Sequence, residues 1–282
     1  MINDIEQTLD AALLGNIDAQ LKISSAYVEG LGVEKNPRMA WYWAKQASDQ
    51  HSSWGDFILG GMLIYGDGVD KDHKEAAKLF KRASSYLPEA CEMLGHLYMA
   101  GAGLRKNPRK AFQYFSKAAA GTVTSAYFCL GFCYQHGKGV KKDIGKAIES
   151  YEIAARKGNA AALVELALLY SAGVAVEKDM QKALDYLQQG SDLGDLSSKI
   201  RLVRFYLDTN DYKNHEVAFE LATELALRGN YFGQIFLGSL YQDRFWHGED
   251  MALAEYWFDK AQKNPFKSME IPFGLKRTEV GL

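Results

Sequence analysis

The sequence predicts an all-α protein, a right-handed α/α solenoid (superhelix) of about seven helix pairs, because one phrase recurs at a fixed interval. The phrase LGHLYMAGAGL at 94–104 returns as LGFCYQHGKGV at 130–140. Successive copies start 35 or 36 residues apart, and the weaker ones begin at Ile23, Leu59, Leu166, Leu202 and Leu237. A fixed period of this length is typical of repeat proteins, in which each unit packs on its neighbours.

A second phrase has the same period and supports the same fold. In it, an Asn or Asp stands four residues before an alanine, at Asn36, Asp72, Asn107, Asp143, Asp179, Asn214 and Asp250. These side chains are favoured at helix N-caps, where they accept hydrogen bonds from exposed backbone amides. Pro37 and Pro108 follow two of them, at a helical position where the missing amide costs nothing. The phrase therefore predicts where the second helix of each repeat begins.

The fourth repeat shows how each element is expected to form. Apolar residues at helical spacing predict a first helix over about 125–136, with Leu130 at the centre of its buried stripe. Gly131 has no side chain and lets another helix approach closely. Two glycines then end the first helix. Asp143 caps the second helix, whose inward face includes Tyr151.

The same reasoning divides the whole chain. We expect an N-terminal capping helix at 1–17 and a C-terminal tail or cap at 265–282. The repeats are expected at approximately 18–51, 52–87, 88–122, 123–158, 159–194, 195–229 and 230–264. Repeats six and seven depart from the pattern, because the glycine loop is replaced at 209–211 and at 244–247.

The pattern A-x-x-x-L-G-x-x-Y-x-x-G-x-G-V-x-x-D-x-x-K-A, followed by an aromatic residue and A-A-x-x-G, resembles the Sel1-like repeat, a relative of the tetratricopeptide repeat. The resemblance covers about 18–264. It implies a non-enzymatic bacterial scaffold or adaptor that binds a partner protein, such as a signalling protein. A narrower alternative is an immunity protein that neutralises a secreted bacterial effector. An enzyme or a ligand-sensing regulator is a further alternative.

Partner contacts are expected on the concave face of the first helices. The residue two positions before each central leucine points away from the buried stripe, yet it is mostly apolar there, as at Phe57 and Phe128. Two interpretations remain open: these side chains pack between first helices, or they line an apolar groove. The residues predicted to contact a partner are Trp54, Phe57, Glu92, His96, Phe128, Phe132, Gln135, Leu168 and Arg204.

A lysine precedes the cap of the second helix in six repeats, at Lys35, Lys71, Lys106, Lys142, Lys178 and Lys213. These lysines form either a solvated face or a basic ridge for an acidic partner. The formal net charge of −2 gives no overall reason to expect a nucleic acid.

Several classes of function are not expected. No window has the apolar length of a membrane span, so membrane insertion is not predicted. The first residues lack the features of a signal peptide, so we expect a cytoplasmic protein, or a periplasmic or secreted one if a leader has been removed. The three cysteines do not recur with the repeat, so we expect no disulfides. Cys129, Cys133 and His136 share a helical face, but we interpret them as packing residues. No metal, cofactor or catalytic residue is therefore predicted.

Overall fold

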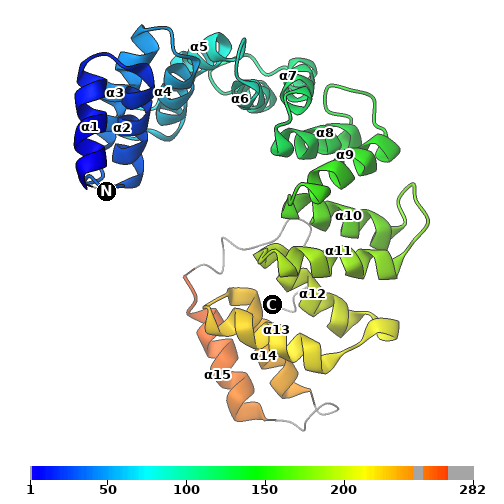
Figure 1. Ribbon diagram of the computed structural model, residues 1–282. Coiled ribbons are helices and arrows are strands. Elements are labelled where there is room, and N and C mark those ends of the chain that lie inside the picture. The colour runs from blue at the N-terminus through cyan, green and yellow to red at the C-terminus, as the bar shows by residue number, and fades with distance from the viewer. Residues whose placement is uncertain (1, 244–249, 266–282) are drawn as a thin grey trace. The chain divides into compact units, whose positions relative to one another are not determined.

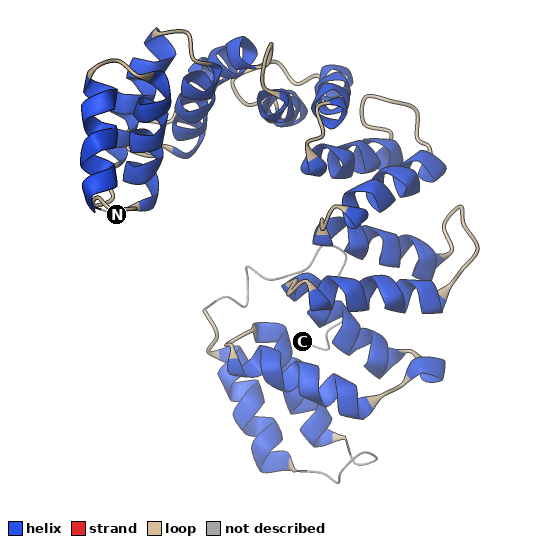
Figure 2. Cartoon of the chain, viewed as in Figure 1, coloured by secondary structure: helices blue, strands red, loops and turns tan. Residues whose placement is uncertain are grey.

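The computed structural model describes residues 2–243 and 250–265 (Figure 1). In these residues the chain forms fifteen α-helices and one 3₁₀ helix, and no strand is present among them (Figure 2). The predicted all-α fold of stacked helix pairs is confirmed. The chain divides into two compact units, residues 1–154 and residues 155–282, and each is described by itself.

Unit 1 contains helices α1 to α8 and most of α9. Their bounds are α1 (Ile2–Leu13), α2 (Ile17–Glu29), α3 (Pro37–Asp49), α4 (Ser53–Tyr65), α5 (His73–Ala83), α6 (Pro88–Ala100), α7 (Pro108–Ala120), α8 (Thr124–His136) and α9 (Ile144–Arg156). Unit 2 contains α10 (Ala160–Ala172), α11 (Met180–Asp192), α12 (Leu196–Asp208), the 3₁₀ helix η1 (Asn210–Tyr212), α13 (His215–Leu227), α14 (Tyr231–Gln242) and α15 (Met251–Gln262). The even-numbered helices are the first helices of the repeats.

The predicted caps all form. In the fourth repeat, Asp143 Oδ1 accepts from the Lys146 amide at 3.0 Å. The corresponding bonds form in the other repeats, at Asn36, Asp72, Asn107, Asp179, Asn214 and Asp250. The first helices of repeats one to five end at a glycine in the left-handed region, such as Gly137 with φ 64°. The two sequence phrases therefore mark real helix boundaries.

The glycine after the central leucine makes room for an aromatic ring of the second helix. A Cβ on Gly95 would lie 2.4 Å from the Phe115 ring, and one on Gly131 would lie 2.5 Å from the Tyr151 ring. The same arrangement recurs for the pairs Gly60–Phe80 and Gly238–Phe258. The close helix approach that the sequence predicted at Gly131 is therefore confirmed.

Where the glycine is absent, the facing residue is smaller. In the fifth repeat Ala167 occupies the glycine position, and the buried Leu187 replaces the ring in the same core cluster. In the sixth repeat these positions hold Val203 and Ala222, both fully buried. The two helices of a repeat are thus matched in side-chain volume, as close-packed interiors require.

Neighbouring repeats of unit 1 meet at the second glycine of each loop. A Cβ on Gly139 would lie 2.0 Å from the Pro108 carbonyl oxygen, which belongs to the preceding second helix. Gly103 stands in the same way against the His73 carbonyl oxygen, where the distance would be 2.1 Å. Both glycines have positive φ, 78° and 67°. These contacts are made by backbone atoms, and only glycine fits them.

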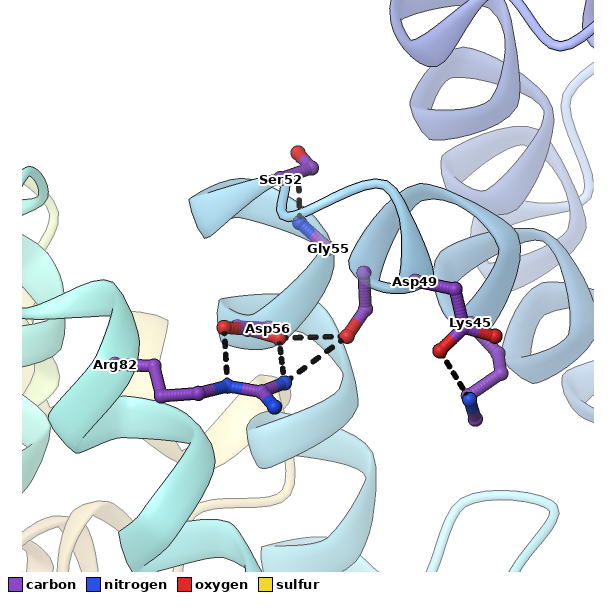
Figure 3. A network of polar contacts seen from close by, with 7 residues as sticks. Lys45, Asp49, Ser52, Gly55, Asp56 and Arg82 are labelled. Atoms are coloured by element: carbon purple, nitrogen blue, oxygen red, sulfur yellow. Dashed lines mark hydrogen bonds and ion pairs between the residues drawn. The ribbon is translucent and has the colours of Figure 1, made fainter.

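A buried carboxylate links three helices of unit 1 (Figure 3). Asp56 on α4 is 5% exposed and accepts a hydrogen bond from Ser48 Oγ on α3 at 2.6 Å. Arg82 on α5 donates to both of its carboxylate oxygens, from Nε at 2.9 Å and from Nη2. Its Nη2 also contacts Ser48 Oγ at 3.2 Å. A bidentate pair of this kind fixes both distance and orientation.

The departures in repeats six and seven have different outcomes. After α12 the chain ends the helix at Thr209, in extended conformation, and turns through η1 without a left-handed glycine. The replaced loop at 244–247 lies outside the described residues, as does the predicted tail at 265–282 beyond Pro265. Of the two replaced glycine loops, the structure therefore describes the conformation of the one in the sixth repeat.

Candidate functional site

The structure distributes the nine predicted contact residues over first helices of both units. Seven lie in unit 1: Trp54 and Phe57 on α4, Glu92 and His96 on α6, and Phe128, Phe132 and Gln135 on α8. We call these seven residues the first-helix surface of unit 1. Leu168 on α10 and Arg204 on α12 belong to unit 2.

Two aromatic residues of the first-helix surface are exposed. Trp54 is 46% exposed and Phe132 is 38% exposed. The Trp54 ring meets Phe57 edge to face, with 5.6 Å between centroids, and Phe57 in turn contacts the buried Phe80 at 5.7 Å. Trp54 therefore packs on aromatic rings that reach the core, while its outer part remains available for contact.

The half-buried aromatics take part in packing within repeats. Phe57 contacts Phe80, and Phe128 lies 5.6 Å from the ring of Tyr151. In unit 2 two of the equivalent residues, Val164 and Ile200, are buried, and the third, Ile235, is half-buried against a core cluster. Packing between helices therefore accounts for the apolar residues at this position in unit 2. In unit 1 it accounts for the buried part of Phe57 and Phe128.

An apolar cavity of about 630 Å³ lies beside Trp54 in unit 1. Leu21 of α2 and Ile58 of α4 contribute to its lining, and so does Ile5 of α1, which the sequence reasoning did not select. Gly32 admits Ile5, because a Cβ there would lie 3.0 Å from the Ile5 side chain. The helix expected to cap the array therefore also forms a wall of this cavity.

A polar cluster joins α6 to α8. His96 Nε2 lies 3.8 Å from Glu92 Oε1 and 3.8 Å from Cys129 Sγ. The His96 ring packs edge to face on Phe115, with 5.1 Å between centroids. The sequence selected Glu92 and His96, but it gave no reason to join them to Cys129, because that contact crosses between repeats.

Burial and nearby charges shift two ionisation equilibria in this cluster. Burial raises the pKa of Glu92, but donors from His96 and Ser125 outweigh it, so that its pKa falls below the ordinary value. Burial, together with the Glu92 charge, raises the pKa of the Cys129 thiol to about 12. At neutral pH, Glu92 is therefore a carboxylate and Cys129 a protonated thiol.

The remaining predicted residues on α8 have structural partners. Gln135 Oε1 accepts a hydrogen bond from the Tyr151 hydroxyl at 2.5 Å and so helps to hold this buried ring. Phe132 lies against His136, with 4.5 Å between ring centroids. Cys133 is fully buried, and burial raises its pKa to about 12. The three cysteines are free thiols.

Unit 2 has its own cavity, of about 320 Å³, beside the other two predicted residues. Leu168, 36% exposed, and Arg204 both line it, together with Met180 of α11. Arg204 Nε donates to Asp208 Oδ2 at 2.9 Å, which orients the guanidinium along α12. The sequence gave no signal for Met180, because its position at the start of a second helix did not place it among the expected contact residues of the first helices.

Two further surface properties concern possible partners. The six lysines that precede the second helices are all exposed: Lys35, Lys71, Lys106, Lys142, Lys178 and Lys213. Among the described residues, no helix has both the length and the apolar character needed to span a membrane.

The capped helix pairs and their volume-matched contacts define a helical repeat protein. The family model of the Sel1 repeat matches residues 17–52, 57–85, 88–122, 124–159, 160–195 and 232–262. The chain therefore belongs to the Sel1 repeat family, whose fold is generally a non-catalytic scaffold for protein interactions. The unmatched interval contains α12 and α13, which nevertheless form a helix pair.

Solved structures support the same fold. A protective antigen present in uropathogenic Escherichia coli strains, described as displaying an SLR fold, is 26% identical with a TM-score of 0.71; the match covers 93% of this chain and 56% of that one. A Sel1 repeat protein from Oxalobacter formigenes has the same identity and TM-score, over 92% of this chain and 75% of that one. A putative sel1 repeat protein from Klebsiella pneumoniae subsp. pneumoniae is 19% identical, with a TM-score of 0.50, over 71% and 98%. No curated protein matches the chain.

Proposed function

We propose that this chain is a non-enzymatic scaffold that binds a partner protein through the first-helix surface of unit 1. The observation that carries the proposal is the exposed Trp54 beside an apolar cavity of about 630 Å³. Tryptophans next to apolar pockets are frequent hot spots of protein interfaces. Membership in a family of interaction scaffolds supports the same proposal.

The surface combines an apolar part on α4 with polar groups on α6. Trp54 and the cavity would receive an apolar side chain of the partner, and Glu92 and His96 on α6 would provide polar contacts. Covering the exposed part of Trp54, roughly 100 Å² of apolar surface, is worth on the order of 2–3 kcal/mol. This corresponds to roughly 30- to 150-fold in Kd.

The test is affinity purification of the partner from the cell of origin, with variants of this chain as baits. Wild-type chain and the double variant Trp54→Glu and Phe132→Glu are used for affinity purification, followed by mass spectrometry. Tyr65→Glu is the matched control, because Tyr65 is a 65% exposed aromatic residue on α4 that does not line the cavity. We expect a protein that wild type and the control retain and the double variant loses, with unchanged circular dichroism.

A purified partner then gives the quantitative result. Isothermal titration calorimetry should show at least about 30-fold weaker binding to Trp54→Glu than to Tyr65→Glu. Equal capture and equal affinity for all three chains would refute the proposal. A secreted toxin recovered in a tight one-to-one complex would identify the narrower form, an immunity protein. Fractionation of the same cells tests the expected cytoplasmic location.

A further inference from the structure

We propose that Glu92, His96 and Cys129 form a binding site for Zn²⁺ in unit 1, with a fourth coordination position open to water. Their ligand atoms lie within 4.8 Å of one another. This is the one such group of three or more His, Cys, Asp and Glu side chains within residues 2–243 and 250–265. The inference goes beyond the proposed scaffold function and does not depend on it.

The distances suit a tetrahedral ion. With bonds of about 2.3 Å to sulfur and about 2.0–2.2 Å to nitrogen and oxygen, ligand atoms around Zn²⁺ lie roughly 3.3–3.6 Å apart. The two measured distances from His96 Nε2, to Glu92 Oε1 and to Cys129 Sγ, are 3.8 Å each. The ligands therefore need to close by only a few tenths of an ångström on these two edges, and the third edge, between Glu92 and Cys129, is within 4.8 Å.

The helical framework already holds the three groups in position. Glu92 and His96 stand four residues apart on α6, which places both side chains on one face of the helix. Cys129 is presented by α8, and its thiol is buried, while half of the His96 side chain is exposed. An ion can therefore enter from the His96 side, and a water can complete the coordination there.

The donor types favour Zn²⁺ over the hard cations. Thiolate and imidazole are preferred by zinc and similar transition metals, whereas Mg²⁺ and Ca²⁺ prefer oxygen ligands throughout. The carboxylate and the thiolate together balance the charge of the ion. On binding, the metal–sulfur bond replaces the S–H bond of Cys129, and the proton passes to solvent. Ser125 remains beside Glu92 and can orient the carboxylate.

The experiment uses the full chain without any partner. After treatment with a chelator, Zn²⁺ is titrated in competition with a chromophoric chelator, and Co²⁺ is added separately to detect thiolate-to-metal charge-transfer absorption. We expect one Zn²⁺ per chain and a charge-transfer band. His96→Gln and Glu92→Gln should each weaken Zn²⁺ binding by about tenfold or more. Cys129→Ser should abolish the band.

Matched controls lie on the same two helices. Glu89→Gln on α6 and His136→Gln on α8 remove the same types of group outside the cluster and should leave Zn²⁺ affinity unchanged. His96 is exposed, so His96→Gln tests the site even if Cys129→Ser loses stability. Absence of saturable Zn²⁺ binding, or equal affinity of wild type, His96→Gln and Glu92→Gln, would overturn the proposal. Because no partner is present, this result is separate from the outcome of the capture experiment.

Discussion

Two adjacent glycines of α4 should respond to alanine with opposite sign. A Cβ on Gly60 would lie 2.8 Å from two ring carbons of Phe80, whereas a Cβ on Gly61 would meet nothing within 4 Å. Carbon atoms in good contact are about 3.5–4.0 Å apart, so Gly60→Ala forces α4 and α5 apart by roughly 1 Å. Gly61→Ala introduces no such contact.

Both substitutions gain the same stability from the higher helix propensity of alanine, and they differ in the packing of the new methyl group. Replacing glycine by alanine in a helix interior stabilises by about 0.8–1 kcal/mol. Overpacking a core costs about 1–3 kcal/mol. Gly61→Ala should therefore raise the free energy of unfolding by up to about 1 kcal/mol, and Gly60→Ala should lower it by up to about 2 kcal/mol. The difference between the variants isolates the contact with Phe80.

Urea denaturation followed by far-ultraviolet circular dichroism measures both free energies. The fifth repeat suggests a rescue, because there an alanine faces Leu187. In the Phe80→Leu background, Gly60→Ala should cost at least about 0.5 kcal/mol less than in wild type. Equal effects of Gly60→Ala and Gly61→Ala, or identical costs in the two backgrounds, would show that the glycine is not there to admit the ring.

The other predictions concern buried polar groups. Arg82→Ala should lower the free energy of unfolding by about 2–3 kcal/mol in urea denaturation, because it leaves the Asp56 carboxylate buried without its cation; an effect below about 0.5 kcal/mol would contradict this. Cys129 and Cys133 should make the metal-free chain lose stability as pH rises from 9 towards 12, since unfolded thiols ionise near 9 and the folded ones only near 12. The free energy of unfolding should fall by up to about 1.4 kcal/mol per pH unit for each thiol, and it should not change through these thiols below pH 8. Urea denaturation at each pH measures the free energy of unfolding of the wild type and of the double variant Cys129→Ala and Cys133→Ala. An equal loss of stability in the wild type and the double variant would contradict this prediction.

The helices and their boundaries could be predicted from the sequence because local rules determine them. Asp143 caps α9 through an amide three residues away, and Gly137 ends α8 by its own backbone angles. The role of Gly131 was also predictable, since the repeat shows a missing side chain at a fixed place. A 35- or 36-residue period repeats each such signal several times, which separates it from chance.

Contacts that occur once could not be predicted in this way. The cavity beside Trp54 depends on Ile5 of α1, a helix that precedes the seven repeats. The cluster of Glu92, His96 and Cys129 requires two neighbouring repeats to differ at matched positions. A repeat pattern contains only the features that the repeats share. Features that arise where repeats differ can be recognised only from the distances between helices.

The backbone contact at the second loop glycine has a consequence for how the chain can change in length. Gly139 meets the carbonyl of Pro108, and Gly103 meets that of His73, so these junctions do not depend on the neighbour's side chain. The volume-matched pair Gly95–Phe115, in contrast, lies wholly inside one repeat. A repeat therefore resembles an exchangeable cassette: its internal fit travels with it, and the loop contact at Gly103 or Gly139 does not depend on the neighbour's side chain. Duplication or deletion of whole cassettes can alter the array while a single point substitution inside one is penalised.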